Sequence, residues 1–141
     1  MTLLEMIVAS GVSLVVFAVG YGLYTRVTRL DEVEARREAM TLTVQNVMSR
    51  VKQDVRAAQS AACSRGSVTL ATGHETITYR TLTDRSGVER LRSDRRAVYR
   101  GLTAEFEASG TGVNVTLRSL AVVHRRPIRI EITSFIRPRN G

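Results

Sequence analysis

The alternation of hydrophobic and polar positions divides the chain into three parts. Residues 6–25 form an apolar run without a charged side chain, and about 20 helical residues at about 1.5 Å each span roughly 30 Å, the hydrocarbon thickness of a bilayer. Residues 26–62 contain no proline or glycine and carry apolar side chains at helical spacing. After Gly66 the pattern alternates with a period of two, which is typical of strands. The sequence therefore predicts one long helix followed by a sheet.

The second part of this helix is expected to be amphipathic. Its apolar positions recur every three or four residues and so share one face; they are Met40, Val44, Met48, Val51, Val55, Ala58 and Ala62. Charged residues 31–38 fit a solvated helix surface. We expect the sheet to cover the apolar face, in preference to a coiled coil, and the helix to end at residues 63–66.

The remaining pattern predicts antiparallel hairpins. Alternating segments separated by turn residues are found at 67–71, 76–82, 88–92, 97–102, 103–108, 113–117 and 128–132. Pro127 suits a strand start or an edge. The expected fold class is α+β, a long N-terminal helix packed on an antiparallel β-sheet. Its parts are a transmembrane half (1–25), an amphipathic half (26–62) and a β-sheet domain (63–141).

An acidic residue, Glu5, stands at the beginning of the apolar run. An unpaired carboxylate in apolar surroundings is costly, so a cationic partner is expected. The α-amino group of Met1 is the nearest candidate, but helix geometry holds it away from Glu5 of its own chain. A staggered neighbouring copy could supply that amine, and the resulting ion pair would favour assembly.

The residues Thr2-Leu-Leu-Glu5-Met-Ile-Val-Ala9 resemble the mature N-terminus of type IV pilins and type II secretion pseudopilins, with their class III methylation signature. The resemblance implies the pilin-like fold, removal of a basic leader by a prepilin peptidase, N-methylation of Met1 and filament assembly driven by Glu5. It covers residues 1 to about 25. One departure is Gly22, where major pilins commonly have proline, and this favours a minor component.

Weaker motifs further along are similar to minor pilins of the W type and minor pseudopilins of the J type. They lie at residues 52–58, 77–80, 91–92 and 102–106. This resemblance implies a minor subunit that primes assembly of a type IV pilus and sits at or near its tip. The implied partners are other minor pilins or pseudopilins, the major pilin and the inner-membrane assembly platform. The C-terminal part is shorter than in that subgroup.

The location follows from the same resemblance. Arg26 and Arg29 follow the apolar run, and the positive-inside rule alone would place the C-terminal part in the cytoplasm. By resemblance to pilins, the removed leader supplies the stronger basic flank. We therefore expect a single pass through the bacterial inner membrane with the C-terminal part outside, followed by incorporation into a pilus or pseudopilus.

Arginine dominates the charge of the chain. The net charge is +8, and Lys52 is the only lysine. Beyond residue 62 the sequence has fourteen arginines and seven acidic residues. Clustered arginines can bind DNA phosphates, acidic lipid headgroups or other acidic partners, but we favour the simpler explanation that a coding bias places arginine instead of lysine on solvated strand faces. The candidate contacts are Arg92, Arg95, Arg96, Arg125 and Arg126.

Catalytic and metal-binding patterns are not found in the sequence. His74 and His124 lack further ligands at a suitable spacing, so no metal is expected, and no cofactor or enzymatic activity is expected either. The single cysteine, Cys63, is expected to be buried.

Other functions stay open beside the pilus. The same fold would serve a minor pseudopilin of a type II secretion system, and the arginines would serve a DNA-binding subunit for DNA uptake. A membrane-tethered sensor would not need Glu5. A secretory signal peptide should begin with basic residues and be shorter, and a plain membrane anchor would leave Glu5 without a purpose.

Overall fold

The computed structural model describes residues 2–64, 66–84, 86–123 and 126–139, with Arg126 described by its backbone alone. Two predicted site residues, Met1 and Arg125, lie outside these ranges, as does His124. The chain divides into two compact units, Met1–Arg37 and Glu38–Gly141. Helix α1 (Leu3–Ala57) runs from the first unit into the second.

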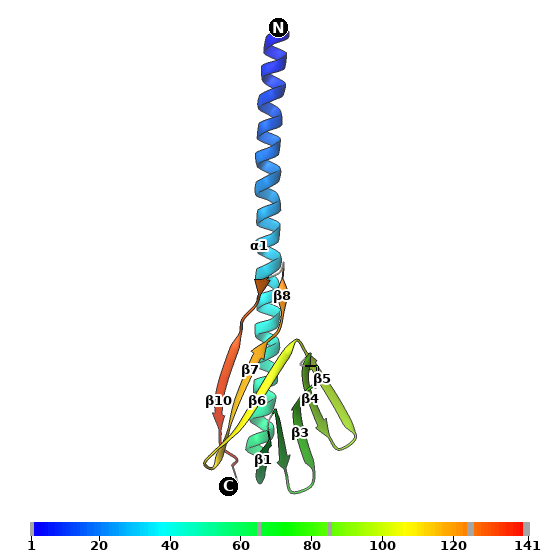
Figure 1. Ribbon diagram of the computed structural model, residues 1–141, viewed down its shortest axis with the longest axis vertical. Coiled ribbons are helices and arrows are strands. Elements are labelled where there is room, and N and C mark those ends of the chain that lie inside the picture. The colour runs from blue at the N-terminus through cyan, green and yellow to red at the C-terminus, as the bar shows by residue number, and fades with distance from the viewer. Residues whose placement is uncertain (1, 65, 85, 124–125, 140–141) are drawn as a thin grey trace. The chain divides into compact units, whose positions relative to one another are not determined.

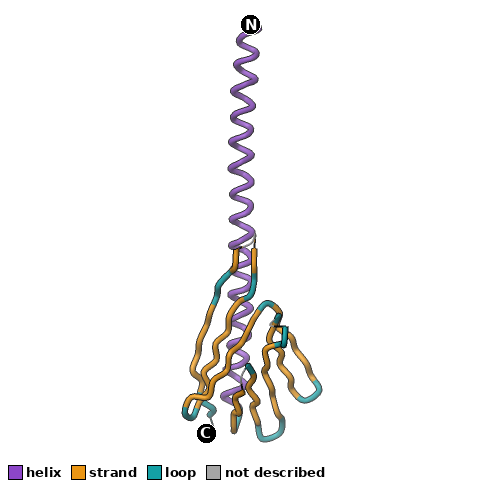
Figure 2. Tube along the Cα trace, in the orientation of Figure 1, coloured by secondary structure: helices purple, strands orange, loops and turns teal. Residues whose placement is uncertain are grey.

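The strands form three antiparallel sheets. The first has the order β1-β2-β3-β4-β5 and the second the order β10-β7-β6, while β8 and β9 form a two-stranded ribbon. The described loops between the strands are drawn in teal in Figure 2. The bounds are β1 Ser60–Ser64, β2 Ser67–Ala71, β3 Thr76–Thr81, β4 Gly87–Arg92, β5 Arg95–Arg100, β6 Leu102–Ser109, β7 Gly112–Ser119, β8 Val122–Val123, β9 Arg126–Pro127 and β10 Glu131–Ile136.

The first unit is the N-terminal part of α1, and its large apolar side chains are exposed. Leu3, Val16 and Phe17 are among them, with 76%, 64% and 78% of their surface exposed. This helix is long and apolar enough to cross a membrane. The hydroxyl groups of Ser10, Ser13 and Thr25 donate to carbonyl oxygens of the same helix, so they would not be left unpaired in a bilayer.

The core of the second unit lies between the last turns of α1 and the two larger sheets. The predicted helix face is confirmed for Val44, Met48, Val51 and Val55, which are buried together with Val47. Met40 is partly buried, and Ala58 is buried directly after the end of the helix. Inward side chains of both sheets complete the core, among them Leu70, Tyr79, Val88, Leu102, Phe106, Val115 and Leu117. The fold is thus the predicted α+β arrangement of a long N-terminal helix packed on antiparallel sheet (Figure 1).

A hydroxyl group joins the two larger sheets. Thr81, at the end of β3, donates its Oγ1 hydrogen to the carbonyl oxygen of Ala104 on β6 at 2.7 Å. The amide of Ala104 donates back to Oγ1 of Thr81 at 3.1 Å. This reciprocal pair of hydrogen bonds connects β6 to the end of β3 and so links the two sheets.

The predicted end of the helix is wrong by five residues. The amide of Ala58 still donates to the carbonyl of Asp54, but the amide of Gln59 donates to Ala71 of β2 at 2.8 Å. Residues 60–64 then pair with β2 and form β1. Pairing with a neighbouring strand overrides the helix preference of the alanines in this segment. Ala62 is therefore exposed on a strand and is not part of the helix face.

Most hairpins are confirmed, and the last strand is shifted. The predicted hairpin around residues 109–112 joins β6 to β7, with Ser109 paired with Gly112. The final strand begins at Glu131, three residues later than expected, because its register is set by pairing with β7. Cys63 is half-buried, not fully buried, and partial burial raises the pKa of its thiol.

Candidate functional site

The start of α1 carries a capping box built from Thr2 and Glu5. The amide of Thr2 donates to Oε2 of Glu5 at 2.8 Å, and the amide of Glu5 approaches Oγ1 of Thr2 at 3.4 Å. Such a reciprocal pair satisfies two helix amides that would otherwise lack an acceptor. The carboxylate of Glu5 is exposed and can accept further hydrogen bonds. Its predicted partner, Met1, lies outside the described residues.

A buried polar cluster connects α1 to the first sheet. Oδ2 of Asp54 accepts a hydrogen bond from the hydroxyl of Tyr79 at 2.5 Å and one from Nε of Arg90 at 2.8 Å. Nε of Arg90 also lies 3.0 Å from the hydroxyl oxygen of Tyr79. Burial, reinforced by the neighbouring Asp54 carboxylate, raises the pKa of Tyr79, and the hydrogen bond to Asp54 raises the pKa of Arg90. Tyr79 is therefore neutral and Arg90 charged.

Arg90 is one of the residues that line a cleft of about 780 Å³ in the second unit. Its side chain is 9% exposed, and its Nη2 atom has no hydrogen-bond partner among the described residues. We call this cleft the arginine cleft. Its lining consists of Arg50 on α1, Glu75 in the loop before β3, and Arg90, Arg92, Ser93, Asp94, Arg95, Arg96 and Ala97 on the β4–β5 hairpin.

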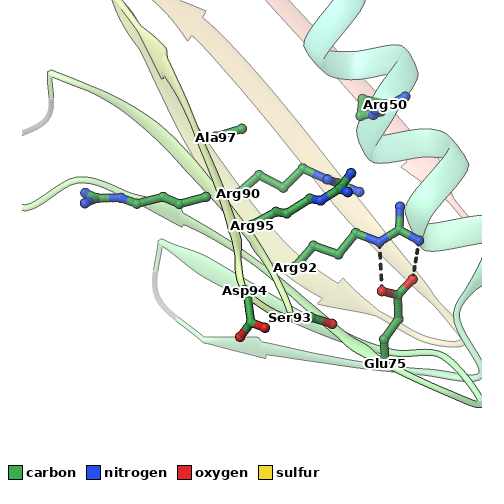
Figure 3. A pocket seen from close by; sticks show the side chains of 9 residues that line it. Arg50, Glu75, Arg90, Arg92, Ser93, Asp94, Arg95 and Ala97 are labelled. Carbon is green, nitrogen blue, oxygen red and sulfur yellow. Dashed lines mark hydrogen bonds and ion pairs between the residues drawn. The ribbon is translucent and has the colours of Figure 1, made fainter.

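Strand alternation decides which arginines face the cleft. Arg92 pairs with Arg95 in the register of the hairpin, and Arg90 pairs with Ala97, so these side chains share the face of the sheet that carries Tyr79 and faces α1. Figure 3 shows the guanidinium groups of Arg92 and Arg95 extending towards the α1 side. The carboxylate of Asp94 points away from them.

The sheet's opposite face carries a separate ion cluster around Glu89. This carboxylate is buried, and it pairs with Arg80 across the β3–β4 register and with Arg96 on β5. The hydrogen bond from Arg80 is the main reason that the pKa of Glu89 lies below its ordinary value, although burial opposes it. Arg96 is thus already neutralised by an acid of its own chain.

The pairing of Glu89 predicts a specific loss of stability in acid. Because its pKa is lowered on folding, Glu89 stabilises the protein above the unfolded value of 4.5, and this contribution is lost as the pH falls below that value. We expect the midpoint of thermal unfolding of Glu89→Gln to decrease less steeply than that of the wild type as the pH falls below about 4.5. Glu107→Gln, at an exposed residue of β6, is the control and should leave the slope unchanged. If the midpoint decreases with pH equally steeply in Glu89→Gln and Glu107→Gln, Glu89 does not cause the loss of stability in acid.

The predicted basic site is only partly assembled. Arg92 and Arg95 lie together in the arginine cleft, but Arg92 is bound in two places by Glu75, through Nε at 2.8 Å and Nη2 at 2.6 Å. Arg96 is turned to the other face. Arg126 belongs to β9 by its backbone, and Arg125 lies outside the described residues. The five predicted residues therefore do not form one described surface.

The site residues that were missed in the sequence include Arg50, Asp54 and Arg90. Arg90 is in an inward strand position, two residues after the buried Val88, and this alternation could have indicated an inward charge. Asp54 and Arg50 lie four residues apart on α1, but nothing in the sequence shows which strand faces them. The capping box at Thr2 and Glu5 is readable from the spacing of threonine and glutamate.

The described residues hold no group of three or more histidine, cysteine, aspartate or glutamate side chains placed to bind a metal ion. Comparison with family models, with curated proteins and with solved structures finds no match for the chain.

Proposed function

We propose that the chain is a non-enzymatic, minor pilin-like subunit that primes assembly of a type IV pilus and sits at or near its tip. The observation that carries this proposal is the combination, on one helix, of an exposed apolar surface with an exposed acid in the first turn. The apolar surface calls for lipid or neighbouring helices. The pilin-like α+β layout supports the same proposal.

The helix glycines support close approach by other helices. A Cβ atom added at Gly11, Gly20 or Gly22 would meet nothing within 4 Å. These glycines therefore have no packing role within the described chain, although each lowers helix stability by about 0.5–1 kcal/mol relative to alanine. In membrane helices, small residues let neighbouring backbones come close. We infer that they serve contacts with other subunits.

The proposed mechanism assigns two tasks to Glu5. Its Oε2 caps the first turn of its own helix by accepting from Thr2, and its remaining acceptor positions receive the amine of Met1 from a neighbouring subunit. Before assembly the chain would be held in the inner membrane by residues 6–25, with the C-terminal part outside. After assembly the β-sheet unit would contact other minor subunits.

Three variants separate the capping role from the charge. Glu5→Ala removes both, Glu5→Gln keeps a capping acceptor without the charge, and Thr2→Ala removes the capping hydroxyl while leaving the charge. We expect both Glu5 variants, but not Thr2→Ala, to lose co-purification with sheared pili by about tenfold or more, as for loss of a charge-assisted contact. Incorporation of Glu5→Gln at the wild-type level would refute the ion-pair mechanism.

Counting surface pili tests whether the chain is needed for pilus assembly. A strain deleted for this gene, with a plasmid copy as the control, should lose surface pili in electron micrographs and regain them with the plasmid. Normal pili in the deletion strain would refute the pilus function and favour the type II secretion pseudopilus, which would use the same helix and the same Glu5.

A further inference from the structure

The arginine cleft contains more positive charge than its own chain neutralises. Arg90, Arg92 and Arg96 each pair with an acid, namely Asp54, Glu75 and Glu89. Within the described part of the chain, Arg50 and Arg95 have no such partner, and both are exposed. Asp94 lies on the rim but turns its carboxylate away in Figure 3. Two unpaired guanidinium groups therefore flank the cleft.

The lining of the cleft includes a third guanidinium group, that of Arg90. Nη2 of Arg90 is buried without a hydrogen-bond partner among the described residues, although Nε of the same group is held by Asp54 at 2.8 Å. Because Nη2 is too buried to touch a ligand, Arg90 would act on an anion in the cleft through its positive charge. Arg90 cannot swing away, because Asp54 and Tyr79 fix its guanidinium group.

The amount and placement of charge favour carboxylates over a nucleic acid. Duplex DNA carries one charge per about 1.7 Å of its axis, and a duplex laid on this surface would bring phosphates near Glu75 and Asp94. One or two carboxylates match the two unpaired arginines, and the planar guanidinium fork binds a carboxylate through two hydrogen bonds.

The edge of β5, which also lines the cleft, favours a polypeptide as the ligand that provides those carboxylates. Strand β5 is the last strand of its sheet, so its outer edge has no strand partner among the described residues. An extended peptide can add to such an edge through backbone hydrogen bonds, while alternate side chains enter neighbouring pockets. We propose that the arginine cleft and the edge of β5 bind an extended acidic segment of a partner protein, with its carboxylate between Arg50 and Arg95. This inference does not depend on the pilus function.

The test uses the full chain in uncharged detergent micelles and a dye-labelled octapeptide that alternates glutamate with threonine. Fluorescence anisotropy should show binding that weakens with salt. The double variant Arg50→Gln/Arg95→Gln should weaken binding by about tenfold or more, as expected for loss of charge-assisted hydrogen bonds. A matched double variant, Arg56→Gln/Arg100→Gln, removes one exposed arginine from the same helix and one from the same strand. It should stay within about twofold of the wild type.

Two further probes decide the class of ligand. A peptide with glutamine in place of glutamate should not bind, and inorganic phosphate should compete weakly. Equal weakening in both double variants would overturn the proposal, as would equal binding of the glutamine peptide. Tighter binding of a duplex oligonucleotide than of the acidic peptide at the same ionic strength would also overturn it, in favour of phosphate recognition.

Discussion

Replacing Asp54 by alanine is expected to destabilise the second unit by about 3–5 kcal/mol, the range measured when one partner of a buried ion pair is removed. Asp54 and Arg90 are 13% and 9% exposed, so the guanidinium group left behind would be charged, buried and without its acidic partner. The hydroxyl of Tyr79 would lose its acceptor as well. The midpoint of thermal unfolding, followed by circular dichroism on the full chain in micelles, should fall by roughly 10 °C or more.

Two controls identify the cause of this loss. Glu105→Ala breaks an exposed ion pair with Arg118, in which the two side chains are 57% and 46% exposed, and should change stability by less than about 1 kcal/mol. Replacing the whole cluster by apolar residues, as Asp54→Leu/Tyr79→Phe/Arg90→Met, should recover much of the loss because no buried polar group stays unpaired. A midpoint for Asp54→Ala equal to that of Glu105→Ala would contradict the buried role.

The sequence predicts those parts of the fold that depend on local periodicity. The apolar positions from Val44 to Val55 lie on one face of α1 as expected, because helical geometry alone places them there. The hairpin of β6 and β7 follows from alternation and from a glycine-rich turn at residues 109–112. The change from helix to strand is also visible as a change of period.

The parts that depend on pairing between distant segments could not be predicted in this way. Residues 60–64 have helix-compatible alanines and become a strand only because β2 is available beside them. The last strand begins at Glu131, opposite Arg118, because β7 sets its register. Periodicity says nothing about which strand lies opposite a given segment.

The candidate site shows the same limit more strongly. Counting arginines predicted a basic surface, but the count could not separate Arg95, which is unpaired among the described residues, from Arg96, which is neutralised by Glu89. These neighbours differ because successive strand residues point to opposite faces. Arg90 and Asp54 are 36 residues apart in sequence, and their pairing depends on how β4 packs against α1. Only the tertiary structure assembles the cleft.

The second large effect is expected at Gly87, where β4 begins opposite Arg100 of β5. A Cβ atom at this position would lie 2.7 Å from the carbonyl oxygen of Tyr99 and 3.2 Å from Cα of Arg100. Both are backbone atoms, so no side-chain rotation relieves the overlap and the two strands must separate. We expect Gly87→Ala to lower the free energy of unfolding by about 2–3 kcal/mol, as for an overpacked site.

A matched glycine outside the strands tests whether the close backbone approach is responsible. At Gly73, an added Cβ would meet only the flexible side chain of Gln59, at 3.3 Å, so Gly73→Ala should be nearly neutral in the same unfolding measurement. The β4–β5 hairpin carries Arg90, Arg92 and Arg95. Separation of its strands should therefore also weaken binding of the acidic peptide, which links the stability of this hairpin to the arginine cleft. Equal midpoints for Gly87→Ala and Gly73→Ala would show that the hairpin accommodates the methyl group without separating.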